Sequence, residues 1–225
     1  MDGIIIVNKP SGITSYDVIR FLKRNYSIRD KIGHAGTLDP LAEGVLIVCI
    51  GKATKLSSSF MGLEKEYIAE MLLGKITDTD DIDGRVVKEK PVDVAKADVE
   101  RLIPMYKGDI EQVPPVVSAI KYKGSPLYKL YRKGVGVTPA KRTVFIKEIE
   151  ILGIELPRVT FRVVCSKGTY IRALCRDIGN ELGCGGVQTA LKRTKVGTFT
   201  IEHSLALEEI KSRGLAESLI KIDRL

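Results

Sequence analysis

The chain has 225 residues, of which 44% are apolar, and its formal net charge is +8. This length and composition fit one large domain with a real core and exclude a disordered or low-complexity chain. No apolar run approaches the ~20 residues that a membrane span requires, and the N-terminus lacks the pattern of a secretory signal. We therefore expect a cytoplasmic protein that does not enter a membrane.

The first half of the sequence predicts short strands mixed with helices. A turn at 8–12 follows the first strand, and Thr14 or Ser15 can cap a helix whose Val18, Ile19 and Leu22 share one face. The remaining predicted elements are a strand at 3–7, a buried strand at 45–50, a short helix at 53–61, a strand near 67–73 and an acidic turn at 77–84.

The second half adds a helix at 94–106, an alternating strand at 158–165 and a helix at 170–182 that stops at Gly183. Strands outnumber helices and come in consecutive runs rather than in strict alternation with them. This order favours an α+β fold with a mixed, mainly antiparallel sheet flanked by helices, over a doubly wound one.

The sequence offers little support for a metal site. Its four cysteines lie far apart without C-x-x-C spacing, beside apolar stretches, and we interpret them as core residues. The acidic turn at 77–84 matches a calcium loop only weakly, because Ile82 and Arg85 spoil the pattern. A solvated turn is the better interpretation.

The positive charge concentrates in one stretch, residues 118–144, which holds many Lys and Arg, three Tyr and no acidic residue. Basic residues interleaved with aromatic residues suit an arm that grips a phosphate backbone and stacks on bases. An exposed basic loop without a partner has the same composition. We expect RNA contact here.

The loop GHAGTLDPLAEG at 33–44 surrounds a single carboxylate, Asp39, with residues of special backbone conformation. Taken alone, Asp39 could form a turn, cap a helix or bind a metal. Pro40 pushes Asp39 toward extended conformations, and the glycines allow another chain to approach closely.

Six motifs, in order along nearly the whole chain, resemble those of the TruB family of tRNA pseudouridine synthases. They are NKPSGITS at 8–15, GHAGTLDPLAEG at 33–44, KEY at 65–67, GKITDTDDIDG at 74–84, CSKGTYIR at 165–172 and LKR at 191–193. The resemblance implies the pseudouridine-synthase catalytic fold. It also implies isomerisation of uridine 55 in the T-stem-loop of tRNA by base flipping, with no cofactor and no metal.

The resemblance also implies roles for particular residues. Asp39 aligns with the nucleophile, Tyr67 with a tyrosine that stacks on the base and assists proton transfer, and Arg172 with an arginine that offsets the desolvation of the carboxylate. His34, Tyr170 and Leu191 match positions that line the nucleotide pocket. We expect Lys9 and Pro10 to buttress Tyr67, and Asp80 to orient basic residues. By pattern alone, Arg172 would be a surface residue, Tyr67 and Leu191 core residues and Tyr170 a helix-start residue.

Chains of this family usually carry a C-terminal PUA domain, a small RNA-binding barrel. This sequence reaches Asp223-Arg224-Leu225 about where that module would begin. We therefore expect a single catalytic domain over 1–225, without the PUA domain, acting as a monomer. The alternatives are a guide-RNA-dependent synthase that modifies ribosomal RNA, a catalytically idle tRNA chaperone and a basic protein–protein adaptor.

Overall fold

The computed structural model describes residues 1–222, which fall into two compact units. The first comprises Met1–Ile68 and the chain from Leu191 on, and the second comprises Ala69–Ala190. Strands β4 (Lys65–Leu73) and β12 (Gly186–Val196) contribute residues to both units. The expectation of one domain over the whole chain stays a prediction, and the expected boundary at 223–225 lies outside the described residues.

The first unit is built on two buried antiparallel strands, β1 (Gly3–Lys9) and β3 (Glu43–Ile50). Strand β2 (Ile32–Ala35) pairs antiparallel with β3, and β14 (Ile220–Lys221) pairs antiparallel with β1. The end of β12 runs parallel to the start of β3, with Arg193 opposite Gly44. The strands predicted at 3–7 and 45–50 are thereby confirmed.

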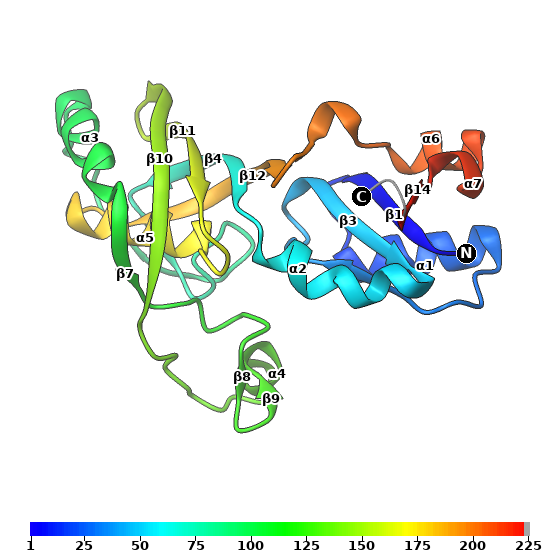
Figure 1. Ribbon diagram of the computed structural model, residues 1–225. Coiled ribbons are helices and arrows are strands. Elements are labelled where there is room, and N and C mark those ends of the chain that lie inside the picture. Colours follow the sequence, from blue (N-terminus) through cyan, green and yellow to red (C-terminus); the bar gives the residue numbers. More distant parts are fainter. Residues whose placement is uncertain (223–225) are drawn as a thin grey trace. The chain divides into compact units, whose positions relative to one another are not determined.

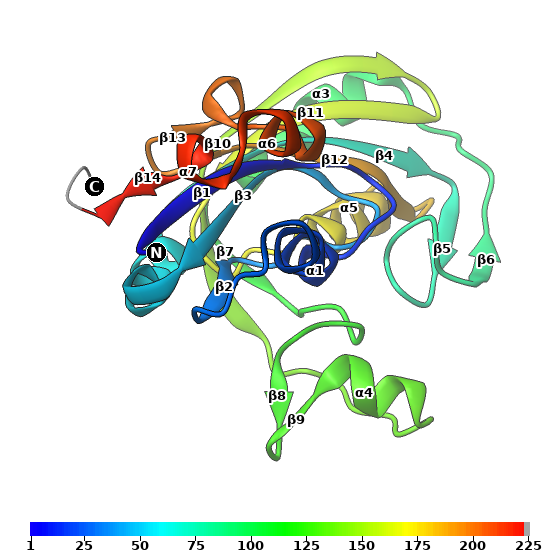
Figure 2. The same ribbon diagram turned by 90° about the vertical axis from the view of Figure 1, so that its right-hand side faces the viewer.

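Both faces of the β1–β3 pair are buried, because alternate side chains of a strand point to opposite sides. Helix α1 (Ser15–Tyr26) covers one face with Val18 and Leu22 (Figure 2). Thr14 caps this helix as predicted: it accepts a hydrogen bond from the N–H of Asp17, whose carboxylate accepts one from the N–H of Thr14. Helices α6 (Leu207–Arg213) and α7 (Leu215–Ser218) add Ile210 and Leu215 to the same core.

The other face packs against a 3-10 helix, η1 (Gly51–Leu56), and helix α2 (Ser57–Gly62), which contribute Ala53 and Phe60. These two elements replace the single short helix predicted at 53–61. The hairpin of β12 with β13 (Phe199–Thr200), followed by η3 (Ile201–His203), adds Val196 and Phe199 to this core. A continuous apolar run such as Val45–Ile50 is therefore explained by burial on both sides.

The second unit has the strand order β12-β4-β11-β10-β7, which includes β7 (Gly108–Gln112), β10 (Arg142–Glu155) and β11 (Arg158–Cys165). The pairs β10–β11 and β10–β7 are antiparallel. A hairpin of β5 (Lys75–Thr77) and β6 (Val86–Glu89) carries the acidic turn. The predicted strand at 158–165 coincides with β11, whereas the long strand β10 was not predicted.

Helix α5 (Ile171–Glu181) lies beside the strands of the second unit (Figure 1) and confirms the helix predicted at 170–182, with Tyr170 as its N-cap. The helix predicted at 94–106 is split into α3 (Lys96–Leu102) and the 3-10 helix η2 (Ile103–Tyr106). Pro104 explains the split, because proline lacks the N–H that would continue the α-helical ladder.

The basic stretch 118–144 forms an arm that projects from the ends of β7 and β10 (Figures 1 and 2). It contains a small hairpin, β8 (Lys121–Tyr122) with β9 (Ser125–Pro126), and helix α4 (Leu127–Arg132).

Taken together, the two units confirm the predicted α+β class with a mainly antiparallel sheet and flanking helices. Within residues 1–222, no helix has the length and apolar character that crossing a membrane requires.

Candidate active site

The loop that carries Asp39 connects β2 to β3 and is held by a buried arginine from another strand. Arg193, on β12, is 1% exposed. Its Nε donates to the main-chain oxygen of Val45 at 2.7 Å, and its Nη2 donates to that of Gly36 at 2.9 Å. The two acceptors flank the loop, so one guanidinium clamps both of its ends. Because the two bonds come from one planar, rigid group, they fix the distance between the two ends of the loop.

A second buried cation, Lys9 at the end of β1, holds the middle of the loop. Its Nζ donates to the main-chain oxygens of Pro10 at 2.8 Å, Ile13 at 2.7 Å and Pro40 at 3.4 Å. Burial lowers the pKa of Lys9 to about 8, while the nearby Asp39 carboxylate acts to raise it. Lys9 is therefore mainly protonated at neutral pH. The contact with Pro40 shows that Lys9 supports the loop that carries Asp39. The expected support of Tyr67 by Lys9 and Pro10 stays a prediction.

Serine side chains of the NKPSGITS motif complete this support. Ser15 accepts from the N–H of Leu38 at 2.8 Å and donates to its oxygen at 3.0 Å. Ser11 donates to the main-chain oxygen of Leu41 at 2.8 Å, and the N–H of Gly12 donates to that of Pro40 at 2.8 Å. Asp39 thus lies, half-buried, between residues whose main chain is bound on both sides.

Gly44 shows why this part of the loop requires glycine. Its φ is +102°, and a Cβ there would overlap the main-chain oxygen of Arg193. Only glycine permits the close approach of β12 to the start of β3.

The other predicted residues of the first unit are His34, Tyr67 and Leu191. His34 lies on β2 and is half-buried; burial and the Arg193 cation both lower its pKa, so its imidazole is neutral at pH 7. Tyr67 on β4 is 9% exposed and Leu191 on β12 is 8% exposed. The sequence pattern alone indicated that Tyr67 and Leu191 are core residues, and their burial agrees with this interpretation.

Arg172, the predicted cation, lies in the first turn of α5 in the second unit and is 3% exposed. Its Nη1 donates to the main-chain oxygen of Thr79 at 2.9 Å and to Asp81 Oδ2 at 3.3 Å, while Nη2 donates to the oxygen of Val117 at 3.0 Å. A surface position, which the pattern alone favoured, is therefore wrong. The pairing of Arg172 with Asp39 stays a prediction.

Asp80 and its neighbour Asp81 contact different arginines: Asp80 pairs with Arg176, and Asp81 pairs with Arg172. The Oδ2 of Asp80 lies 2.7 Å from Nη1 of Arg176, one helical turn beyond Arg172, and Nη2 of Arg176 donates to the oxygen of Val113 at 2.8 Å. Burial raises the pKa of Asp80, and the two arginines oppose that shift. Asp81, which the sequence reasoning passed over, is the carboxylate beside Arg172. The four acidic residues of this turn look alike in sequence, and only the fold distinguishes them.

Tyr170 is positioned by a side chain that was also missed. Gln112, fully buried on β7, accepts from the N–H of Tyr170 at 2.8 Å and donates to its main-chain oxygen at 3.0 Å. The guanidinium of Arg142 lies over the Tyr170 ring, with 4.8 Å between Cζ and the ring centroid. Tyr170 is therefore fixed both in its backbone and in its ring plane.

The basic arm exposes cationic and aromatic side chains next to one another. Lys123 lies over Tyr122 at 5.6 Å and Arg132 over Tyr128 at 5.7 Å, measured to the ring centroids. Tyr131 on α4 donates to Asp78 at 2.8 Å and so connects the arm to the acidic turn. These pairs have the composition that stacking on bases and contacting phosphates require.

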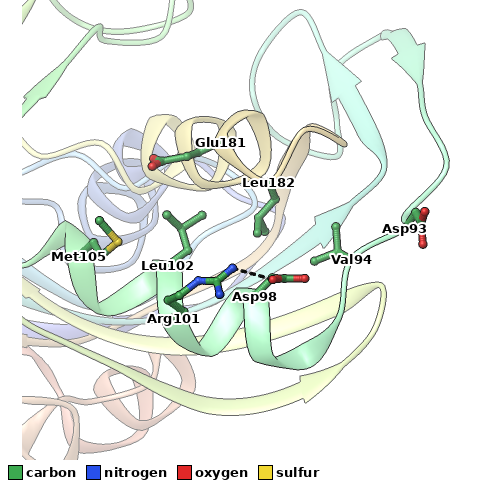
Figure 3. A pocket seen from close by; sticks show the side chains of 8 residues that line it. All are labelled: Asp93, Val94, Asp98, Arg101, Leu102, Met105, Glu181 and Leu182. Carbon is green, nitrogen blue, oxygen red and sulfur yellow. Dashed lines mark hydrogen bonds and ion pairs between the residues drawn. The ribbon is translucent and has the colours of Figure 1, made fainter.

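A surface pocket of about 360 Å³ lies between α3 and the end of α5 in the second unit (Figure 3). Its walls combine carboxylates and apolar side chains, and its lining residues are Asp93, Val94, Asp98, Arg101, Leu102, Met105, Glu181 and Leu182. Arg101 pairs with Asp98 at 2.8 Å. None of the predicted site residues lines it. Within residues 1–222, no cluster of three or more His, Cys, Asp or Glu could hold a metal ion.

Comparison with known proteins agrees with the motifs. Residues 23–171 match the family model of the TruB family pseudouridylate synthase N-terminal domain, and residues 172–222 match that of the tRNA pseudouridylate synthase B C-terminal domain. The chain is 48% identical to the tRNA pseudouridine synthase B of Clostridium kluyveri, covering 100% of this chain and 77% of that protein. The corresponding protein of Clostridium tetani is also 48% identical, with 100% and 78% covered.

Two solved structures share the fold. A Cbf5-Nop10-Gar1 complex contains a chain that is 33% identical with a TM-score of 0.74, covering 93% of this chain and 54% of that one. The second is an H/ACA RNP bound to a substrate RNA containing 2'-deoxyuridine. One chain of it is 30% identical with a TM-score of 0.71, covering 93% of this chain and 52% of that one. The chain thus spans about half the length of these solved relatives.

Proposed function

The chain belongs to the TruB family of pseudouridylate synthases, and from this premise we propose that it isomerises uridine 55 in the T-stem-loop of tRNA. The C1′–N1 bond of the nucleotide breaks and a C1′–C5 bond forms. C5 loses its proton and N1 gains one, so the product is an isomer of the substrate. The relatives at 48% identity are named tRNA pseudouridine synthase B, and they support tRNA as the substrate.

Asp39 is the proposed nucleophile. The observation that carries this assignment is the clamp on its loop, in which Arg193 and Lys9 bind main-chain oxygens on both sides of the aspartate. A carboxylate can attack C6 of the base, attack C1′, or act in a route through a glycal, and all three require an ionised group held in a fixed place. The Lys9 cation lies near enough to Asp39 for the carboxylate to act on the pKa of Lys9, which it raises.

The remaining roles follow the family resemblance. The base must leave its stack, at a cost of a few kcal/mol, and needs flat walls once it has flipped. We assign stacking and proton transfer to Tyr67 and the lining of the nucleotide pocket to His34, Tyr170 and Leu191. Arg172, held by Asp81, is assigned to the Asp39 carboxylate. Asp80 holds Arg176, whose contact to Val113 lies near the base of the arm.

The basic arm at 118–144 is the proposed contact with the tRNA backbone, and it suits a stand-alone enzyme that acts as a monomer in the cytoplasm. The guide-RNA-dependent synthase is the runner-up, because a solved relative at 30% identity comes from an H/ACA RNP bound to a substrate RNA. The two functions differ in one respect that can be measured: the stand-alone enzyme modifies tRNA without a guide RNA.

The test is tritium release from a tRNA transcript labelled with [5-³H]-uridine, without guide RNA, by wild-type protein and by Asp39→Asn. We expect release by the wild type and loss of at least about a thousandfold in rate for Asp39→Asn, since removal of a nucleophile takes away the step that depends on it. The matched control is Asp109→Asn at an exposed position of β7, which should keep full activity.

Retained tRNA binding without release by the wild type would reject the proposed catalysis and favour the chaperone. Release that requires an added guide RNA would favour the runner-up. Equal activity of Asp39→Asn and wild type would reject Asp39 as the nucleophile.

A further inference from the structure

Arg142, the first residue of β10, differs from most of the other arginines of the second unit in what surrounds its charge. Arg158, Arg162, Arg172 and Arg176 each pair with a carboxylate. In contrast, Nε and Nη2 of Arg142 are shielded from solvent and meet no hydrogen-bond acceptor among residues 1–222. A partly buried guanidinium without an acceptor is costly, so an acceptor from a ligand would stabilise it.

The aromatic ring of Tyr170 packs against this guanidinium. The guanidinium lies over the ring of Tyr170, and the main chain of Tyr170 exchanges two hydrogen bonds with the side chain of Gln112. A contact through the face of a guanidinium leaves its N–H groups available to donate hydrogen bonds. Arg142 therefore lies beside a residue that we assign to the nucleotide pocket.

The adjoining turn 166–169 presents a surface that an anion can approach. Ser166 exchanges hydrogen bonds with the main chain of Phe145, which fixes the turn against β10. Lys167 and Gly168 are exposed, and Gly168 lies beside Arg142, since a Cβ on it would be 3.6 Å from Nη1. The glycine leaves room for a backbone, and Lys167 adds a second positive charge.

From these contacts we infer that Arg142 and the turn at 166–168 bind one backbone phosphate of the RNA, next to the nucleotide that inserts against Tyr170. The inference rests on the proposed function for the identity of the RNA. A phosphodiester matches the chemistry, because its two non-bridging oxygens share one negative charge and can accept from a guanidinium, and the adjoining stretch 118–144 lacks acidic residues. Arg142 would then set how far the target nucleotide enters its pocket.

The first test is the salt dependence of binding to a T-stem-loop RNA, measured for wild type, Arg142→Gln and the matched control Arg158→Gln. Arg158 is 53% exposed and already pairs with Glu70. We expect Arg142→Gln to raise Kd about tenfold and to reduce the slope of log K against log salt by about 0.7–0.9, the loss of one phosphate contact. The control should keep the wild-type slope. An unchanged slope for Arg142→Gln would overturn the inference, because mere packing on Tyr170 carries no salt dependence.

The second test locates the phosphate. Neutral methylphosphonate linkages are placed one at a time around the target uridine, and Kd is measured for each RNA. We expect one linkage to weaken binding to the wild type and to have no further effect on Arg142→Gln, whereas the other linkages affect both proteins equally. If every linkage acts equally on both proteins, the inference is wrong.

Arg142→Lys serves if Arg142→Gln does not fold, as judged by thermal unfolding. It keeps one positive charge at this position, so it should keep the salt slope and the sensitivity to the single linkage. Loss of the slope in a folded Arg142→Lys protein would contradict a phosphate at this position. Both tests measure binding alone, so failure of the proposed function would appear separately, as wild-type protein that binds this RNA but releases no tritium.

Discussion

The Asp39 loop and the basic arm are both excursions between strands, and the chain holds them in opposite ways. Five main-chain oxygens of the loop and its flanks, those of Gly36, Leu38, Pro40, Leu41 and Val45, accept hydrogen bonds from side chains elsewhere in the first unit. The arm is mostly exposed, and in the part of the chain that the structure describes, hydrogen bonds hold it near its base and at Tyr131.

This difference matches the two tasks that we propose. A nucleophile has to be placed within a fraction of an ångström, so its loop benefits from rigid support. An arm that grips a flexible RNA backbone has to adapt, so its low local stability is useful. The residues that hold each region therefore make separate predictions about catalysis and binding.

The largest effect is expected from filling the tight contact under the loop. Gly44→Ala places a Cβ against the main-chain oxygen of Arg193 at a φ of +102° and should cost about 3 kcal/mol or more in the free energy of unfolding. Gly124→Ala in the arm meets nothing within 4 Å, and its φ of +84° should cost only about 1 kcal/mol. Denaturant unfolding measures both. Equal losses would contradict the contrast between the regions.

Removing the clamp should lower the rate of catalysis rather than binding. Arg193→Gln keeps a polar group but loses the charged fork across the loop, so we expect kcat to fall about a hundredfold while KM changes less than about threefold. Lys195→Gln, exposed on the same strand, is the control and should behave as wild type. A folded Arg193→Gln protein with normal kcat would show that the clamp does not position Asp39.

The second cation predicts a pH dependence. The protonated form of Lys9 donates to the main-chain oxygen of Pro40, next to Asp39 in the loop, and its pKa of about 8 means that this form is lost as pH rises above that value. We expect kcat to fall about fivefold between pH 7 and pH 9 and to recover on return to pH 7. The alkaline decline should be absent in Lys9→Met, whose rate is low throughout. A decline of the same size in both proteins would assign it to another group.

The smallest effect concerns the arm. Tyr131→Phe removes an exposed hydrogen bond to Asp78, of the kind that contributes up to about 1 kcal/mol. The arm then has more freedom to lose on binding, so KM for tRNA should rise about twofold with kcat unchanged. Faster amide exchange in α4, without change in α1, would support the assignment. A fall in kcat with constant KM would instead couple the arm to the chemistry.

Much of the fold could be predicted from local pattern. The helix capped by Thr14 and the buried strand at 45–50 have clear periodicity and caps, and both were found where expected. The break at Pro104 was not anticipated, although proline is a local signal. Strand β10 was missed because it follows the basic arm directly, and its charged residues hide the alternation.

The site could be predicted only in part. The family motifs named residues such as Asp39 and Arg172, but the groups that hold them act across long separations in sequence. Arg193 reaches Val45 over 148 positions, and Arg172 reaches Asp81 over 91. Neighbouring acids such as Asp80 and Asp81 have the same local pattern, so only the tertiary structure assigns each to its arginine.

The Asp39 loop is held almost entirely through its peptide groups. Since every residue offers the same carbonyl, side chains such as Thr37, Leu41 and Glu43 can change without removing a single one of these bonds. Sequence drift is therefore tolerated at such positions of the loop, whereas Gly44 and distant residues such as Lys9 and Arg193 carry the constraint. An engineer could redesign the rim of this loop for a different RNA while leaving its aspartate in place.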